Sequence, residues 1–422
     1  MSVIDEDDDF DMFAPVSDKP ADKAENSKAT NVKQIKEQVG QANRTEDLKD
    51  SEGYFRAPPG TVLKGKYTVM GDLGSGVFST VYFVKAKVDE HGEEATFAAK
   101  VLRANETMYK AGLKELDILR KISDHPHLIK LTDSFDLDAS NSASPHLVLV
   151  FERMNLNLRE TLNKFGRDVG ISIEGVRAFG RQLLSALAKL KSLGIVHADF
   201  KPDNILVSQD LKRCVLGDFG SAFYLSEPRQ ATPYIVSRYY RAPEIILGFE
   251  DYGCEMDMWS LGVTLFELYT GQVLFGGQTN NEMLDMMQTR IGKFPMAIIK
   301  RHIVQYERRL EFEPHFESDG RFKRHETDPV TKKIVRRLVK FTQDHAVGQQ
   351  SLKGLIVRKA TEEGEDDVSA GLDENVLDFA DALEKCLALD PAHRIDPADA
   401  LVKLKFFSLN VPQPTKRTKV SE

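Results

Sequence analysis

The stretch from Ile195 to Leu206 decides the fold, and it reads IVHADFKPDNIL. Between two apolar segments it places a carboxylate at Asp199, an ammonium at Lys201 and an amide at Asn204. Such a carboxylate can accept the proton of a substrate hydroxyl, the lysine can neutralise a phosphate, and the amide oxygen can ligate Mg²⁺. The stretch therefore predicts a phosphoryl-transfer loop with Asp199 as its general base. His197 is interpreted as a packed structural histidine.

A second acidic motif follows this loop. Asp-Phe-Gly at 218–220 comes directly after the strand-like pair Val215–Leu216. Alone, the tripeptide predicts only a turn, but downstream of His-x-Asp it indicates a second magnesium ligand at Asp218. Cys214 just before it is either a reactive thiol near a nucleotide or a buried strand cysteine, and burial is the favoured interpretation.

Upstream lies a glycine-rich turn that reads LGSGVFSTV from Leu73 to Val81. Its glycines allow backbone amides to approach phosphates closely, although Ser79 stands where a third glycine would lie; alone, the pattern fits a structural turn equally well. Lys100 then ends the third apolar run, and Glu115 follows in a predicted helix. A Lys–Glu pair would hold the ammonium on the α- and β-phosphates of a nucleotide.

These features occur in the order expected of the eukaryotic protein kinases, with Ala-Pro-Glu at 242–244 completing the series. From residue 67 to 407 the chain resembles that family. The resemblance implies an α+β, two-lobed fold, with a small, mainly antiparallel β lobe at 67–152 and a larger helical lobe at 157–407. It also implies that Asp257 braces the catalytic loop and that Arg394 forms an ion pair with Glu244.

The same resemblance implies ATP and Mg²⁺ as cofactors. Asp199, Lys201, Lys100 and Glu115 would be the catalytic residues, and Asn204 and Asp218 the metal ligands, which also contact the nucleotide. Further nucleotide contacts would come from the glycine-rich turn, the neighbouring strands, the gatekeeper and the hinge, namely Leu73, Gly74, Ser75, Gly76, Val81, Ala98, Lys100, Phe151, Glu152 and Met154.

The segment from Thr232 to Glu244 reads TPYIVSRYYRAPE and resembles the CMGC group of kinases. In most kinases an arginine precedes the catalytic aspartate and pairs with a phosphate on this segment, but here Ala198 occupies that position. If Tyr234 is phosphorylated, its charge needs other cations, and Arg238 and Arg241 are the candidates. We therefore expect phosphorylation of Tyr234 to order the segment.

Within that group the chain resembles the pre-mRNA processing factor 4 kinase family. The motifs that carry this are His-Ala-Asp at 197–199, Gly-Val-Phe-Ser at 76–79 and LYTGQVLF at 268–275. This implies a nuclear serine/threonine kinase that phosphorylates splicing factors of U-snRNP assemblies. A dual-specificity tyrosine-regulated or Cdc-like kinase remains the alternative. A pseudokinase scaffold is disfavoured because the lysine, asparagine and both aspartates are present.

The bulk properties of the 422 residues agree with this interpretation. A formal net charge of −8 argues against a general nucleic-acid binder, and no apolar run is long enough to span a membrane. Cys214, Cys254 and Cys386 form no CxxC pair, so neither a disulfide framework nor a zinc site is indicated. We expect no sequence-specific nucleic-acid binding, no membrane partner and a monomeric kinase domain.

The pattern along the chain predicts where the elements lie. Residues 1–60 form an acidic, mostly disordered tail whose opening residues, with Phe10, Met12 and Phe13, are either solvated or a docking peptide. The expected strands are Tyr67–Leu73, Thr80–Val88, Ala95–Leu102 and His146–Phe151. The expected helices are Lys110–Ile122, Ile173–Leu190 and a buried helix at Met256–Thr270. Residues 293–372 are charged and irregular and are interpreted as an insertion, and 408–422 as a short tail.

Overall fold

The computed structural model describes residues 50, 53–87, 94–137, 145–228, 234, 236–310, 312–342, 348–363 and 373–408. The chain divides into two compact units. The first holds the described residues up to Ser123 together with Lys130–Arg153. The second holds Asp124–Ile129 and the described residues from Met154 onward.

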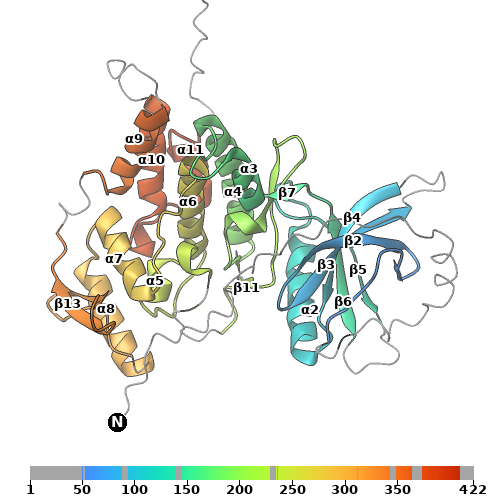
Figure 1. Cartoon of the computed structure of the whole chain (residues 1–422), viewed down its shortest axis with the longest axis horizontal. Coiled ribbons are helices and arrows are strands. Elements are labelled where there is room, and N and C mark those ends of the chain that lie inside the picture. The colour runs from blue at the N-terminus through green and yellow to red at the C-terminus, as the bar shows by residue number, and fades with distance from the viewer. Residues whose placement is uncertain are drawn as a thin grey trace, which may run out of the picture. The chain divides into compact units, whose positions relative to one another are not determined.

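In its described residues, the first unit is a six-stranded sheet with the helix α2 packed on it (Figure 1). The strand order is β1-β2-β3-β4-β6-β5, and every neighbouring pair is antiparallel. This confirms the small antiparallel lobe that the resemblance implied. The elements are β1 (Val62–Leu63), β2 (Tyr67–Ser75), β3 (Ser79–Lys87), β4 (Glu94–Leu102), α2 (Glu106–Ile122), β5 (Leu131–Leu137) and β6 (His146–Glu152).

The helix α2 begins one turn earlier than the sequence pattern predicted. Asn105 provides the reason, because its side-chain oxygen accepts a hydrogen bond from the Met108 amide and caps the helix. Leu116, Ile118 and Leu119 are buried, whereas Leu113 is 44% exposed. The strand β5 was missed, because Asp133 and Asp136 interrupt its apolar pattern.

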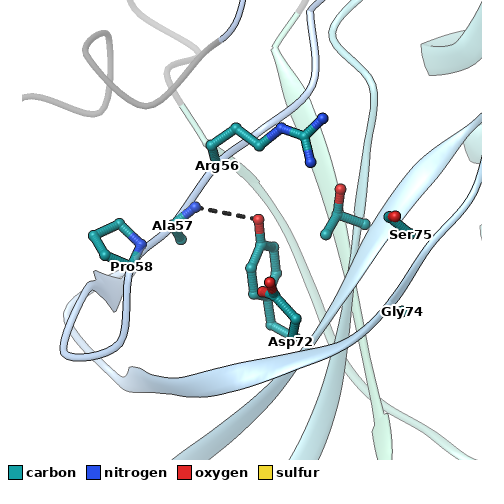
Figure 2. Close-up of a pocket in the computed structure, with 8 residues that line it drawn as sticks. Arg56, Ala57, Pro58, Asp72, Gly74 and Ser75 are labelled. Atoms are coloured by element: carbon teal, nitrogen blue, oxygen red, sulfur yellow. Dashed lines mark hydrogen bonds between the residues drawn. The ribbon is translucent and has the colours of Figure 1, made fainter. Parts of the chain in front are cut away.

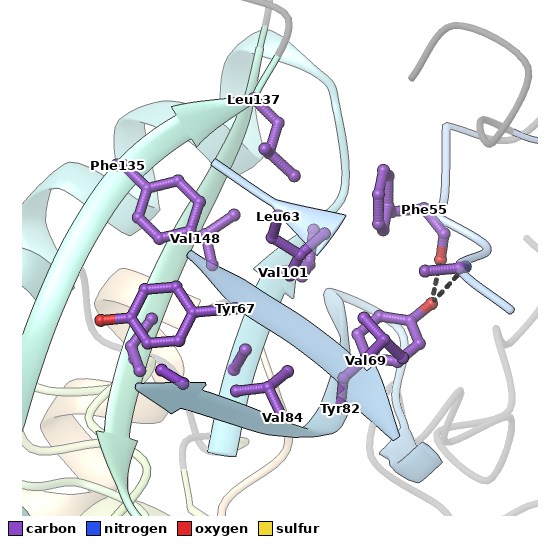
Figure 3. Packing of buried hydrophobic residues seen from close by; sticks show 14 residues of the cluster. Phe55, Leu63, Tyr67, Val69, Tyr82, Val84, Val101, Phe135, Leu137 and Val148 are labelled. Atoms are coloured by element: carbon purple, nitrogen blue, oxygen red, sulfur yellow. Dashed lines mark hydrogen bonds between the residues drawn. The ribbon is translucent and has the colours of Figure 1, made fainter. Parts of the chain in front are cut away.

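One face of the sheet carries the hydrophobic core of the first unit (Figure 3). Tyr67, Tyr82, Val84 and Val148 lie in it, and Phe55 packs edge-on against Tyr82. Residues up to about 60 were expected to be mostly disordered. This expectation is wrong for the end of the segment, around Phe55, because the Phe55 side chain is 1% exposed. A single buried aromatic ring orders this polar segment, and composition averaged over sixty residues hides it. Residues 1–49, with the expected docking peptide, lie outside the described residues.

The second unit is mainly helical. Its helices are α3 (Leu158–Phe165), α4 (Ile173–Ser192), α5 (Pro243–Ile246), α6 (Glu255–Thr270), α7 (Asn280–Arg290), α8 (Met296–Gln305), α9 (Leu352–Glu363), α10 (Glu374–Cys386) and α11 (Pro397–Lys403). Its strands are the short β7 (Leu156–Asn157), β8 (Ile195–Val196), β9 (Ile205–Val207), β10 (Cys214–Leu216), β11 (Phe223–Tyr224), β12 (Phe322–Thr327) and β13 (Ile334–Val339). Short 3₁₀ helices cover Pro202–Asn204, Arg238–Tyr240 and Pro391–His393, and a π-helical turn covers Tyr306–Leu310.

The helix α6 forms the centre of the second unit and packs against α4, α9 and α10 (Figure 1). Every residue from Met256 to Thr270 is buried, as the unbroken apolar pattern predicted. The helix ends at Gly271 in the left-handed conformation, with φ +72°. A Cβ at this position would lie 2.6 Å from the Asp168 carbonyl carbon, so glycine is required both by the turn and by the packing.

The insertion predicted at 293–372 is more regular than its composition indicated. It forms α8, the hairpin β12–β13 and α9, and it has a buried cluster of its own that includes His302, His315 and Phe316. His302 is anchored to the body of the unit, because its Nδ1 donates to the carbonyl of Leu247 at 3.1 Å. Histidines do not register as apolar in a sequence pattern, which is why this core was missed. Residues 364–372 lie outside the described residues.

Candidate active site

The carboxylate of Asp199 lies at the centre of a group of polar contacts in the second unit. The Lys201 ammonium is 2.9 Å from its Oδ2, and the Asn204 amide donates to the same oxygen at 2.9 Å. The Ser237 hydroxyl donates to Oδ1 at 2.9 Å and accepts from Lys201 at 2.9 Å. Both Asp199 and Lys201 are less than one-fifth exposed. The group holds the Asp199 carboxylate in place next to the Lys201 ammonium.

Asp257, at the start of α6, binds the backbone of this loop through hydrogen bonds. Its two carboxylate oxygens accept from the amides of His197 at 2.7 Å and Ala198 at 3.0 Å. Burial raises the pKa of Asp257, while His197 and the two amide donors oppose the rise. Ala198 has φ +63°, a conformation that is costly for any residue with a Cβ, and the two hydrogen bonds hold it there. The bracing role expected of Asp257 is present.

His197 is buried and structural, as predicted. Its Nδ1 accepts from the Asp199 amide at 3.2 Å, so Nε2 carries the proton and donates to the carbonyl of Gly217 at 2.9 Å. Its ring also meets the edge of Phe219 at a centroid distance of 4.9 Å. One imidazole therefore ties the loop that carries Asp199 to the turn that carries Asp218.

Asp218 follows β10 and has φ +53°. The Gly217 amide donates to the carbonyl of Asn204 at 2.8 Å, which places the two predicted metal-ligand residues on adjoining backbone. Because the amide nitrogen of Asn204 faces Asp199, its side-chain oxygen remains as an acceptor. One carboxylate and one amide oxygen suit Mg²⁺, which keeps waters and takes phosphate oxygens as its other ligands. Among the described residues no cluster of three or more His, Cys, Asp or Glu side chains could hold a metal.

Of the two interpretations of Cys214, a reactive thiol or a buried strand cysteine, the structure supports the buried cysteine. Cys214 on β10 is 0% exposed, and burial raises the pKa of its thiol well above the usual value. Cys254 and Cys386 are also buried free thiols.

In the first unit, the ammonium of Lys100 lies 2.8 Å and 3.1 Å from the two carboxylate oxygens of Glu115. Their side chains are 15% and 5% exposed. The expected pair is thus formed within one unit, between β4 and α2.

The strand registers place the other predicted nucleotide contacts beside Lys100. Val81 pairs with Lys100, and Phe151 pairs with Ala98. Directly opposite residues, and residues two apart on one strand, share a face of a sheet. One face of the sheet is therefore lined by Val81, Ala98, Lys100 and Phe151. The hydrophobic core lies on the other face, which includes Ala99, the β4 residue between Ala98 and Lys100.

The glycine-rich turn and the hinge complete the set. An added Cβ at Gly74 or Gly76 would meet nothing within 4 Å, so space for a ligand exists at the backbone there. Leu73 is 49% exposed and Ser75 is exposed as well. Glu152 and Met154 are half-buried and lie on either side of the point where the chain leaves the first unit. The open space at the two glycines allows backbone amides of the turn to approach phosphates closely.

Among the regulatory candidates, Arg241 lies close to Tyr234. The Arg241 guanidinium donates to the carbonyl of Tyr234 at 3.3 Å and lies 5.8 Å from its ring centroid. Arg241 also donates to the carbonyl of Val236 and to Asn280, and it is 4% exposed. The ring of Tyr234 is 42% exposed. Thr232, Pro233 and Ile235 lie outside the described residues.

Comparison with known proteins decides the family. The model of the protein kinase domain matches residues 67–407. The chain belongs to the protein kinase family. It is 39% identical over 414 residues to serine/threonine-protein kinase prp4 of Schizosaccharomyces pombe, covering 96% of this chain and 79% of that protein.

Two further relatives place the kinase within its group. Serine/threonine-protein kinase prpf4B of Dictyostelium discoideum is 35% identical over 93% of this chain, which spans 46% of that protein's length. Dual specificity tyrosine-phosphorylation-regulated kinase 3 of Rattus norvegicus is 30% identical over 88% of this chain and 59% of that protein. The chain is a serine/threonine kinase of the CMGC type, close to the Prp4 kinases. Enzymes of this family use ATP, usually with Mg²⁺.

The kinase also contains the buried ion pair that its family resemblance implied. Arg394 donates to both carboxylate oxygens of Glu244, at 2.7 Å and 2.9 Å, and the two side chains are 0% and 2% exposed. The Arg394 guanidinium lies 5.3 Å from the centroid of Trp259. This pair joins the Ala-Pro-Glu motif to the segment before α11.

Two groups of functional contacts were missed in the sequence. Ser237 lies within the TPYIVSRYYRAPE segment, but its sequence position did not predict the hydrogen bond to Asp199. The second group is centred on Arg159 of α3, which forms an ion pair with Glu267 of α6 and donates to the hydroxyl of Tyr240. Burial raises the pKa of Tyr240, and Glu267 adds to the rise. No local spacing signals this contact, because its members are far apart in the chain.

Proposed function

We propose that this kinase phosphorylates serine and threonine residues of pre-mRNA splicing factors in the nucleus. The observation that carries the proposal is the similarity to a Prp4 kinase along 96% of the chain, together with the motifs of the pre-mRNA processing factor 4 kinase family. The substrates would be proteins of U-snRNP assemblies. The proposal includes a monomeric kinase domain, no sequence-specific nucleic-acid binding and no membrane partner.

The roles of the residues follow from their chemistry. Asp199 orients the substrate hydroxyl and accepts its proton, while Lys201 neutralises charge on the transferred phosphoryl group. Asn204 and Asp218 would hold Mg²⁺, which offsets the negative charge of the phosphates when bound. Lys100, held by Glu115, would bind the α- and β-phosphates.

The remaining nucleotide contacts are assigned by resemblance. The backbone of Glu152 and Met154 would bind the adenine, with Phe151 as gatekeeper. Leu73, Val81 and Ala98 would contact its faces, and the amides of Gly74, Ser75 and Gly76 would cover the phosphates. The apolar character and half-exposure of the strand residues support this assignment.

The first experiment separates an enzyme from a binding module. Wild-type protein with ATP and Mg²⁺ should phosphorylate an Arg/Ser-rich splicing-factor substrate, and Asp199→Asn should lower kcat by at least about 10³-fold. Asp210→Asn, at an exposed aspartate in the β9–β10 turn, is the matched control and should leave kcat unchanged. Equal activity of wild type and Asp199→Asn would support a pseudokinase scaffold.

The second experiment tests the splicing role. Proximity labelling in cells should recover U-snRNP proteins in the nucleus, and their phosphorylation should fall when Asp199→Asn replaces the wild type. Recovery of cytoplasmic partners alone would favour the alternative of a dual-specificity tyrosine-regulated or Cdc-like kinase, to which the similarity with the rat kinase also points.

We further propose that Tyr234 is phosphorylated during folding and that Arg241 and Arg238 then bind the phosphate. The proximity of Arg241 to Tyr234 supports this, because a phosphate charge of about −2 on an exposed ring lies within reach of a guanidinium. Tyr234→Phe should lower kcat, and mass spectrometry should find phosphate on the wild-type residue. Full activity of the Phe variant would exclude this regulation.

A further inference from the structure

A segment that precedes the matched kinase domain crosses the core face of the β2–β3 hairpin (Figure 2). We call Gly53–Pro58 the strap. The hydroxyl of Tyr82 donates to the carbonyl of Phe55 at 2.6 Å and accepts from the amide of Ala57 at 3.2 Å. Together with the buried ring of Phe55, these bonds fix the middle of the strap to β3.

The strap also reaches the tip of the glycine-rich turn. The hydroxyl of Tyr54 donates to the carbonyl of Val77 at 2.8 Å. The next carbonyl, that of Phe78, accepts from the backbone amide of Arg103 at 2.9 Å. Two consecutive carbonyls at the tip are thus bound by donors from outside the hairpin, although the side chains of Val77 and Phe78 are 53% and 39% exposed. Hydrogen bonds rather than buried side chains position this tip.

The two donors are themselves connected. The amide of Ala104 donates to the carbonyl of Gly53 at 2.9 Å, and the Arg103 guanidinium lies 4.7 Å from the ring centroid of Tyr54. Directly after them, Asn105 caps α2, the helix that carries Glu115. Tyr54 therefore lies where the strap, the tip of the turn and the start of α2 meet.

A cavity of about 400 Å³ lies between the strap and the hairpin (Figure 2). Arg56, Pro58, Asp72, Ser75 and Thr80 line it. Because this space is not filled by side chains, the strap does not hold the turn through continuous packing. The direct contact that joins the strap to the tip is the hydrogen bond from the Tyr54 hydroxyl to the Val77 carbonyl.

We propose that Tyr54 is a positioning residue for nucleotide binding. Its hydroxyl holds the tip of the glycine-rich turn in the conformation in which the turn covers the phosphates, and it couples that conformation to the start of α2. Tyr54 itself does not contact the nucleotide, because the strap packs on the core face of the sheet and Lys100 lies on the opposite face.

The test is Tyr54→Phe, which removes one hydroxyl and keeps the ring. The KM for ATP should rise about threefold to tenfold, the range that one neutral hydrogen bond can supply, while kcat changes by less than about twofold. Hydrogen–deuterium exchange of the nucleotide-free protein should become faster at the Gly76 amide, which donates to Ser79 at 2.9 Å within the tip.

Tyr67→Phe is the matched control. The Tyr67 hydroxyl donates to Asp133 at 2.9 Å in the same unit, away from the glycine-rich turn. This variant should lower the Tm without changing the KM for ATP or the exchange at Gly76. The KM measurement rests on the proposed function, with ATP as the phosphoryl donor, whereas the exchange measurement needs no activity. A failure of the proposed function can therefore be distinguished from a failure of the positioning role of Tyr54. An unchanged KM and unchanged exchange in Tyr54→Phe would overturn the proposal, as would a loss of Tm and kcat with an unaltered KM.

Discussion

Ser237 reaches the carboxylate of Asp199 from 38 positions further along the chain. Its hydroxyl is both a donor to Asp199 and an acceptor from Lys201, so it bridges this carboxylate and this ammonium in addition to their direct ion pair. At the scale of the residue, the carboxylate of Asp199, the proposed base, is therefore positioned by two different segments. The loop itself supplies Lys201 and Asn204 as partners of this carboxylate. The segment after Tyr234 supplies Ser237, which binds both Asp199 and Lys201.

Replacing Ser237 tests this bridge. Ser237→Ala should lower kcat about tenfold to a hundredfold, because it removes a hydrogen bond to a charged group, whereas Ser237→Thr keeps the hydroxyl and should retain most of the activity. Steady-state kinetics with varied ATP and peptide concentrations would measure both parameters. An alanine variant with wild-type kcat would show that the bridge is dispensable.

The elements of the insertion are joined to the body of the second unit through histidines. His302 of α8 donates to Leu247 and accepts from the backbone amide of His315, and the two imidazole rings stack at 5.5 Å. Burial lowers the pKa of His302 to about 4, with the Leu247 bond opposing the fall, and it lowers the pKa of His315 further below its usual range. Both rings are therefore neutral in the folded protein near pH 7.

This arrangement predicts acid lability at the insertion. In the unfolded chain each histidine binds a proton near pH 6.5, whereas folded His302 resists protonation down to pH about 4. The stability is thus present above pH 6.5 and falls as the pH decreases toward 4, by about 1.4 kcal/mol per pH unit for each histidine. Urea unfolding between pH 7 and 4.5 would measure the slope.

His302→Gln provides the control, because glutamine can donate and accept hydrogen bonds but does not titrate in this range. The variant should be less stable at pH 7 and should have a shallower dependence on pH. An identical slope in wild type and variant would mean that other groups cause the acid lability.

A buried ion pair between two elements should contribute more to the free energy of unfolding than an exposed pair within one helix. Arg394→Met should lower the free energy of unfolding by about 3–5 kcal/mol, because the carboxylate of Glu244 would remain buried without its partner. Lys121→Met removes an exposed pair with Asp117 within α2 and should cost less than about 0.5 kcal/mol. Similar losses in both variants, measured by urea titration, would contradict this account.

At the scale of the whole molecule, ATP and Mg²⁺ should stabilise the folded kinase. A ligand at a hundred times its Kd adds about 2.7 kcal/mol to the free energy of unfolding, which is an increase of a few degrees in Tm. Removing Mg²⁺ with EDTA should abolish most of this increase. Asp218→Asn should bind ATP with a much smaller dependence on Mg²⁺, and an unchanged Mg²⁺ effect in this variant would exclude Asp218 as a ligand.

The sequence by itself determined the family, the order of the catalytic motifs and the longest elements. Short-range patterns carry this information: the spacing of Asp199, Lys201 and Asn204 lies within one loop, and the buried helix α6 is apolar along its whole length. The Lys100–Glu115 pair could also be predicted, because each residue has one place in the kinase pattern.

Only the tertiary structure decided which distant residues support that machinery. Ser237 on Asp199, Arg159 on Glu267 and Tyr54 on the glycine-rich turn are single contacts between segments, and a hydrogen bond between distant segments leaves no periodic pattern in either one. The order around Phe55 and the histidine core of the insertion were missed for a related reason. One buried ring or a few neutral imidazoles can organise a segment whose average composition is polar, because burial depends on the partner surface that folding brings to it.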